Sequence, residues 1–372
     1  MRLTSPVRVP GVPLQRPVRV AGGALQGPAR IAGAVLQTPV RVASTVLPGP
    51  TRLAGSLLPL GLTPAEVDAP RRAPAMPPAG DGPPLGLGPG SLVWRLFAES
   101  YQALTAGSIG LLQTMHPAIG QSLQDHSNFF EDPLDRIFRS LPHIMRVVYA
   151  DPFAAPGPTA QGELVRSFHG SIKGTDDQGR DYDALDGETF FWAHMTFVYG
   201  IVAGSDRLGL PLTEEQRDQL FAEALLWYRR YGASEDGIPE TRAELEAWWT
   251  HMCRDVLEHN ATSQGILDAA KDGVPCPVPG LPEPVWELIQ RPLLTAWLWV
   301  GVGLLPEDCR DTLGVAWTDR DERRLALLRT AIRSCNGLLP PFVRYHPLAY
   351  AAMRQIAREQ RVSFRRAVDG PV

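Results

Sequence analysis

The chain has 372 residues and 44% of them are hydrophobic, so it can bury a substantial core and is too apolar to be disordered throughout. Its net charge of −4 hides an asymmetry, because residues 1–60 carry seven arginines and no acidic residue, which leaves −11 on the remainder. A basic segment joined to an acidic body indicates an anionic contact for that segment: lipid headgroups, nucleic acid or the body itself.

Residues 1–60 contain an eleven-residue repeat with Arg at its third position and Val, Ile or Leu at its fourth. The five copies begin at Pro6, Pro17, Pro28, Pro39 and Pro50. Eleven residues are close to three helical turns, so the apolar positions share one face, as in helices that lie on lipid surfaces. A proline in every copy opposes a continuous helix, at about 3 kcal/mol each. The repeat therefore predicts either short interfacial helices or a disordered low-complexity extension.

Residues 61–90 are dense in Pro and Gly and predict a linker, so we expect a folded domain over 91–360 and a short tail over 361–372. The N-terminus lacks the uninterrupted apolar region of a signal peptide. The longest apolar run, Leu293–Leu305, is shorter than the roughly 20 residues that span a bilayer. None of the four cysteines forms a C-x-x-C pair, which argues against a zinc ribbon, a thioredoxin-like pair and covalent haem attachment, and favours a reducing, cytoplasmic setting.

The body has helical periodicity and no convincing run of alternating strand residues, so we predict an all-α fold. Capping boxes at Thr213-x-x-Gln216 and Thr241-x-x-Glu244 each start a helix, and Gly232 ends the first of them. A further helix is expected over Arg320–Ser334.

The segment Phe190–Val202 is apolar all round, which predicts a central, buried helix. His194 lies in its middle. A buried imidazole needs a partner, because an unsatisfied polar group in a core costs about 1–3 kcal/mol. His194 therefore either bonds a neighbouring carbonyl or carboxylate, or binds a metal.

Three stretches, in order, carry a resemblance to a known family: Leu111–Gly120 (LLQTMHPAIG), Arg166–Gly174 (RSFHGSIKG) and Phe191–Thr196 (FWAHMT). Together they resemble the MpaB and rubber-oxygenase (latex-clearing protein) family, over roughly residues 93–357. The resemblance implies a helical bundle around a non-covalent haem b, with His194 as the proximal iron ligand.

The same resemblance implies that Arg166 faces a haem propionate or orders the pocket; the alternative is an ion pair at the surface. His169 lies one helical turn after Arg166 and fits the distal or acid–base position of the MpaB-like branch, whereas the latex-clearing branch has Lys and Thr in this stretch. For Lys173 we favour a solvated position.

Three other histidines are weaker candidates. His116 and His126 match family positions, and we favour structural roles for both. His251 has Asp255 one turn later, which indicates either a held histidine or a solvated pair.

Other metal chemistry is disfavoured, because the chain has neither the Glu-x-x-His pairs of a di-iron bundle nor an H-E-x-x-H motif. We therefore expect a haem-dependent oxygenase that uses O₂ on an apolar, isoprenoid or olefinic substrate, with no nucleic-acid partner. We expect it in the cytoplasm, peripheral to membranes or lipid inclusions through residues 1–60. The alternative is a non-catalytic lipid-surface or storage-granule protein that acts through the repeat.

Overall fold

The computed structural model describes residues 86–150, 157–277 and 280–369. The repeat and most of the expected linker lie outside the described residues, so the expectations for residues 1–60 stay predictions. The first helix described begins at Leu92, and the Ser91 side chain accepts a hydrogen bond from Trp94 N there.

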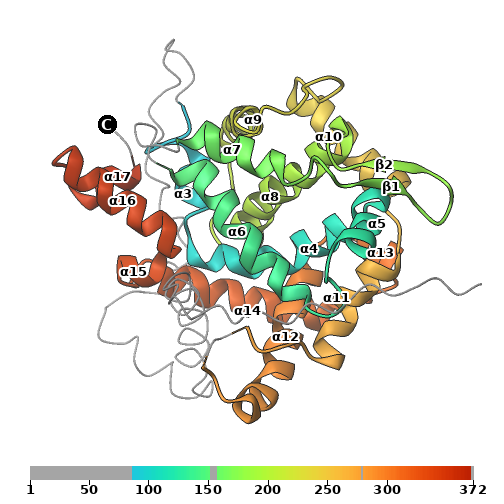
Figure 1. Ribbon diagram of the computed structural model, residues 1–372. Coiled ribbons are helices and arrows are strands. Elements are labelled where there is room, and N and C mark those ends of the chain that lie inside the picture. The colour runs from blue at the N-terminus through green and yellow to red at the C-terminus, as the bar shows by residue number, and fades with distance from the viewer. Residues whose placement is uncertain (1–85, 151–156, 278–279, 370–372) are drawn as a thin grey trace, which may run out of the picture.

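The described residues form helices and one small hairpin, which confirms the all-α prediction (Figure 1). In chain order the elements are α3 (Leu92–Leu96), η2 (Ser100–Thr105), α4 (Ala106–Met115), α5 (Pro117–His126), α6 (Pro133–Tyr149), α7 (Pro158–Ser167), β1 (Lys173–Thr175), β2 (Asp181–Asp183), α8 (Gly187–Arg207), α9 (Glu214–Arg229), α10 (Arg242–His251), η3 (Met252–Val256), α11 (Ala261–Asp272), α12 (Glu283–Leu304), α13 (Glu307–Leu313), α14 (Asp319–Asn336), α15 (Pro341–Arg344), α16 (Pro347–Glu359) and α17 (Phe364–Asp369).

The hairpin was not predicted from the sequence. Its strands are antiparallel, with Gly174 opposite Tyr182, and each has three residues. A strand this short shows too few alternations for a period of two to stand out.

Helix α8 is the central element, as its all-round apolarity predicted (Figure 1). The Asp186 side chain caps its start by accepting from Thr189 N. Phe191 and Met195 join a core with α3, α6 and α9, while Trp192 joins a second core with α4, α5 and α13. Since α8 packs on both sides, a polar side chain at its middle cannot reach solvent.

Glycines allow neighbouring helices to approach α8 and α4 closely. A Cβ on Gly301 of α12 would lie 2.9 Å from Gly107 Cα of α4, and a Cβ on Gly200 of α8 would lie 2.6 Å from Ile109 Cδ1. At Gly301 the neighbour is backbone, so no larger residue fits without backbone movement, whereas at Gly200 the end of the Ile109 side chain would have to shift. These glycines therefore permit the close spacing of α4, α8 and α12.

The two predicted helix starts are confirmed. Both capping boxes form, at Thr213 and at Thr241. Gly232 has φ of +63°, the left-handed conformation that favours glycine, but α9 itself ends earlier, at Arg229, with Arg230 as its C-cap. The predicted helix over Arg320–Ser334 is α14, which begins one residue earlier and ends two residues later.

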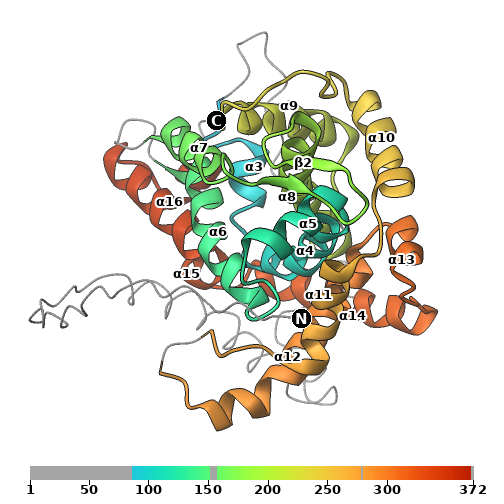
Figure 2. The same ribbon diagram turned by 45° about the vertical axis from the view of Figure 1, so that its right-hand side comes forward.

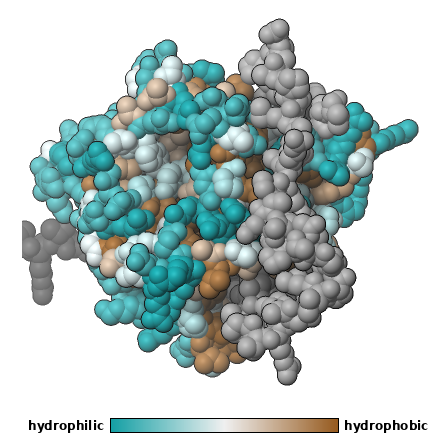
Figure 3. All heavy atoms as spheres, turned by 180° about the vertical axis from the view of Figure 1, so that it is seen from behind, coloured by the Kyte–Doolittle hydropathy of each residue, from teal (hydrophilic) through white to brown (hydrophobic). Residues whose placement is uncertain are grey.

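Over the part of the chain that the structure describes, no helix is long and apolar enough to cross a membrane. The apolar run that begins at Leu293 forms the second half of α12. Figure 3 shows the opposite face of the molecule, where hydrophobic side chains gather at the lower end, near the start of α12. Val285 and Leu288 of this helix are 43% and 77% exposed.

Candidate functional site

His194 lies in the middle of α8 and is buried, with 3% of its surface exposed. One ring nitrogen, Nε2, lies 3.0 Å from the carbonyl oxygen of Ala224 in α9. Because a carbonyl only accepts, Nε2 carries the proton and Nδ1 has the lone pair. Burial lowers the pKa of His194 to about 3, against a smaller opposing effect of the Ala224 hydrogen bond. His194 is therefore neutral at physiological pH.

Four aromatic rings surround His194 and are called here the His194 cage: Phe191 of α8 with Trp227, Tyr228 and Tyr231 of α9 and its end. Their ring centroids lie 5.1 to 6.3 Å from that of His194. The sequence predicted the helix α9 but not that one of its faces encloses the histidine.

Three buried polar atoms in this region lack a hydrogen-bond partner: His194 Nδ1, Trp227 Nε1 and the Tyr231 hydroxyl. Burial raises the pKa of the Tyr231 hydroxyl, and the nearby Trp227 indole has a smaller, opposing effect on that pKa. The contact between the two groups lacks the geometry of a full hydrogen bond. Buried polar atoms in native proteins are nearly always paired, so a group of three indicates a place for a ligand or ordered water.

Arg166 and His169 come from the end of α7, on the far side of Phe190. His169 is half-buried, and its Nδ1 lies 2.8 Å from the Val165 carbonyl oxygen. Its ring packs edge-on against Phe190 at 5.6 Å, Phe190 packs against Tyr231 at 5.5 Å, and Tyr231 packs against His194 at 5.7 Å. The two histidines therefore flank one aromatic pair, Phe190 and Tyr231.

The side chain of Arg166 is exposed, at the last turn of α7. A Cβ built on Gly232 would lie 4.0 Å from Arg166 Nε, so the guanidinium lies beside the residue that follows Tyr231. Gly162 makes this possible: a Cβ there would lie 2.0 Å from the Arg230 carbonyl oxygen. Helix α7 thus contacts the end of α9 through a glycine, which brings Arg166 and His169 to the His194 region.

His116 is a second buried histidine with unpaired nitrogens. It lies between α4 and α5, both ring nitrogens lack a partner, and burial lowers its pKa to about 4. Its ring stacks on Trp192 at 6.5 Å. Trp192 precedes His194 by two residues but belongs to the other core, so His116 lies on the opposite side of α8 from the cage.

The remaining weaker candidates are at the surface. His126 is exposed, with Nε2 at 3.2 Å from the Lys173 carbonyl oxygen. His251 contacts Asp255 at 2.8 Å, with more than half of each side chain exposed. Lys173 pairs with Asp183 across the hairpin at 2.6 Å and is 59% exposed.

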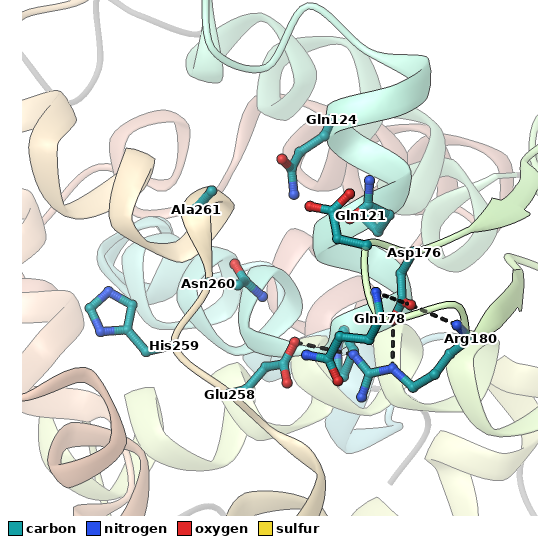
Figure 4. Close-up of a pocket in the computed structure, with 11 residues that line it drawn as sticks. Gln121, Gln124, Asp176, Gln178, Arg180, Glu258, His259, Asn260 and Ala261 are labelled. Atoms are coloured by element: carbon teal, nitrogen blue, oxygen red, sulfur yellow. Dashed lines mark hydrogen bonds and ion pairs between the residues drawn. The ribbon is translucent and has the colours of Figure 1, made fainter.

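A polar cleft lies elsewhere, where the hairpin loop meets the segment between η3 and α11 (Figure 4). Arg180 lines it and contacts Asp176 at 2.5 Å and Glu258 at 3.4 Å. Because these charges satisfy one another, and because no side chain of the His194 cage lines it, this cleft is not the predicted site.

A bare metal ion has no obvious set of protein ligands. Across the described ranges, no group of three or more His, Cys, Asp or Glu side chains is placed to hold one. A metal bound at His194 would therefore have a single protein ligand and need a prosthetic group for its other positions.

The comparison with protein families gives the class of this protein. Residues 94–334 match the catalytic domain of the ER-bound oxygenase mpaB/B'/Rubber oxygenase family, and the chain belongs to that family. It is therefore a protein of oxygenase type, which implies O₂ and a small-molecule or polymer substrate. Searches of curated proteins and of solved structures found no significant match. The match covers every residue described at the His194 site, in α7, α8 and α9 and in the segments that follow α7 and α9.

Proposed function

We propose that this protein is a haem b-dependent oxygenase of an apolar, olefinic substrate, with His194 as the iron ligand. The observation that carries the proposal is the state of His194: neutral, buried, oriented by one hydrogen bond and unpaired at its other nitrogen. Histidines that bind metals usually donate their second N–H to a carbonyl or carboxylate in this way.

The residues present fit such a group in donor chemistry. His194 offers a neutral nitrogen, and the Trp227 and Tyr231 polar atoms beside it are buried without full partners. Aromatic walls suit the flat apolar face of a porphyrin, and an arginine suits its propionates. The rings of Phe190 and Tyr231 lie between the two histidines, so they must change position for the haem to fit.

When bound, the haem supplies the iron at which O₂ is activated. The chain's own residues orient the iron ligand, exclude water and bind the anionic groups. The Ala224 carbonyl fixes the plane and tautomer of His194. The His194 cage excludes water, which strengthens every electrostatic interaction inside. Arg166, at the solvent edge, is placed to pair with an anionic group.

His169 is suited to move a proton. Its contact with the Val165 carbonyl assigns a proton to Nδ1, so Nε2 is the basic nitrogen of the neutral ring. Its half-buried position at the end of α7 links the site to solvent. Both features match the acid–base role that the sequence predicted.

The test is an absorption spectrum of the full chain supplied with haem, beside His194→Ala and the matched surface variant His251→Ala. We expect a Soret band in the parent protein that is lost or shifted in His194→Ala and unchanged in His251→Ala. Absence of the band from the parent protein, together with a negative pyridine haemochromogen assay, would refute the haem proposal.

We further propose that residues 1–60 bring the protein to an anionic lipid surface in the cytoplasm. The support is in the sequence: an Arg at one position of every copy and aliphatic residues at two others. Flotation with vesicles that contain anionic lipid should depend on these arginines. A chain with all five repeat arginines changed to Gln that still floats would exclude this role.

A further inference from the structure

The most exposed apolar side chains of the folded domain are concentrated near its C-terminal end. Leu327 of α14 is 71% exposed, Leu338, which follows α14, is 69% exposed, and Phe342 of α15 is 60% exposed. Among the large apolar residues that the structure describes, only Leu288 of α12 is more exposed than these three. Soluble domains rarely gather exposed apolar side chains in this way, so three within sixteen residues indicate an interaction surface.

Leu327 and Leu338 lie along the outer side of α14. Leu325 is buried and Ile332 packs against the same core, so these two residues mark the inner side. Leu327 points away from that core, because two residues take a helix through more than half a turn. Leu338 follows Leu327 by eleven residues, about three helical turns. The chain keeps turning past the end of α14, since Leu338 N lies 2.9 Å from the Cys335 carbonyl oxygen.

Arginines flank these apolar residues. Arg323 and Arg324 lie one turn before Leu327 and Arg320 lies two turns before it, so all three share its side of α14 and are exposed. Arg324 lies 3.8 Å from Asp321, whereas Arg320 and Arg323 form no ion pair with any residue that the structure describes. The arginines and the apolar residues are called here the α14–α15 strip: Arg320, Arg323, Arg324, Leu327, Leu338 and Phe342.

The next helix adds positive charge beside the strip. Arg354, Arg358 and Arg361 follow one another at intervals of about one turn, along α16 and just beyond it, and all three are exposed. Helix α16 packs against α15, and Figures 1 and 2 show the two side by side at the left-hand edge of the molecule. Residues 319–372 contain eleven arginines and five acidic residues, whereas residues 61–372 together carry a net charge of −11. The strip therefore lies in the basic part of an otherwise acidic domain.

We propose that the α14–α15 strip docks the folded domain on an anionic lipid surface. In such a contact, apolar side chains enter the boundary between headgroups and acyl chains, while arginines pair with lipid phosphates. The strip presents both kinds of side chain along the outer side of one helix and its continuation. The contact is separate from the one proposed for residues 1–60 and needs no haem, so neither of those proposals has to hold for this one to stand.

The exposed apolar surface at the start of α12 shows why charge decides the partner. Leu288 has the exposed Glu287 beside it, Glu283 lies near the start of the same helix, and Arg291 is the exposed arginine one turn later. An anionic surface repels this acidic end of α12 and attracts the strip. A nucleic acid would also attract arginines, but its phosphates offer nothing to exposed leucines. The combination of charge and apolar surface therefore favours lipid.

The experiment uses the full chain with all five repeat arginines changed to Gln, so that the repeat does not supply the binding. Co-sedimentation is measured with vesicles of phosphatidylcholine, with and without phosphatidylglycerol. We expect binding only to the anionic vesicles, several-fold weaker after Leu327→Gln with Leu338→Gln and after Arg320→Gln with Arg324→Gln. The matched controls on α12, Leu288→Gln and Arg291→Gln, should bind as the parent does. Equal melting temperatures check that every variant is folded.

A fluorophore on Cys335 reports directly on the contact. Cys335 is exposed and lies three residues before Leu338, whereas Cys253 and Cys309 are buried, so Cys276→Ser directs a polarity-sensitive dye to this position. Anionic vesicles should shift the emission of this dye to shorter wavelength. The same dye at the exposed position Thr250→Cys of α10, with Cys335→Ser added, should not respond.

Three results would overturn the proposal. Loss of all vesicle binding when the repeat arginines are changed would make the repeat the sole anchor. Leucine variants that bind as the parent does, together with equal retention by duplex DNA, would show a contact by charge alone. Equal losses in the α12 controls, with no response of the dye on Cys335, would place the lipid contact on another face. Haem content enters none of these measurements, so they leave the haem proposal untouched.

Discussion

The pH dependence of stability should reveal the buried, neutral state of His194. Its folded pKa is about 3, whereas an unfolded histidine has a pKa of about 6.5. Between these values only the unfolded chain takes up the proton, so stability is fully present above about pH 6.5 and is lost as the pH falls towards 3. From pH 7 to pH 5 the loss from this one residue is about 2 kcal/mol.

The perturbation is His194→Leu, which removes the titrating group and keeps the site apolar. Urea unfolding of the haem-free protein, followed by tryptophan fluorescence at pH 7, 6 and 5, gives the free energy of unfolding of each form. The difference between parent and variant should change by about 2 kcal/mol over this range, in the direction that weakens the parent at low pH. His116 and His346, which burial also shifts to about 4, are present in both proteins and cancel.

The matched control is His251→Leu, because that histidine is 56% exposed and outside the cores. A parent–variant difference for His194→Leu that stays constant from pH 7 to pH 5 would refute the reasoning. It would mean that His194 is protonated in the folded protein or reaches water.

Two further predictions concern contacts that hold neighbouring elements together. Gly162→Ala places a Cβ 2.0 Å from the Arg230 carbonyl oxygen, so it should lower the free energy of unfolding by about 1–3 kcal/mol and weaken haem binding. The control Gly170→Ala, whose new Cβ would have its nearest atom at 3.6 Å, should change neither. Equal melting temperatures of the two variants would contradict this. Arg344→Met leaves Glu99, 9% exposed and bonded to it at 2.5 Å, without its charge partner, and should cost roughly 3 kcal/mol in urea unfolding. Restoration by the double change with Glu99→Gln is expected, and its failure would show that the pair is not the cause.

The sequence determined which segments are helical and which helix is central. Periodicity and capping residues act over a few positions, so Thr213 and Thr241 were sufficient to place two helix starts. The all-round apolarity of α8 required burial on both sides and put His194 in the interior. The order of the three motifs gave the family, and Arg166, His169 and His194 as candidates.

Only the tertiary structure decided what surrounds those candidates. That Ala224 orients His194, and that Trp227 and Tyr231 enclose it, depends on how α9 crosses α8, which no local pattern encodes. The ion pair of Arg254 with Asp308 joins residues that are far apart in the chain and lack any spacing motif. Local interactions fix a helix within a few turns, whereas partners across helices are set by packing of the whole core, and that packing is a property of all its residues together.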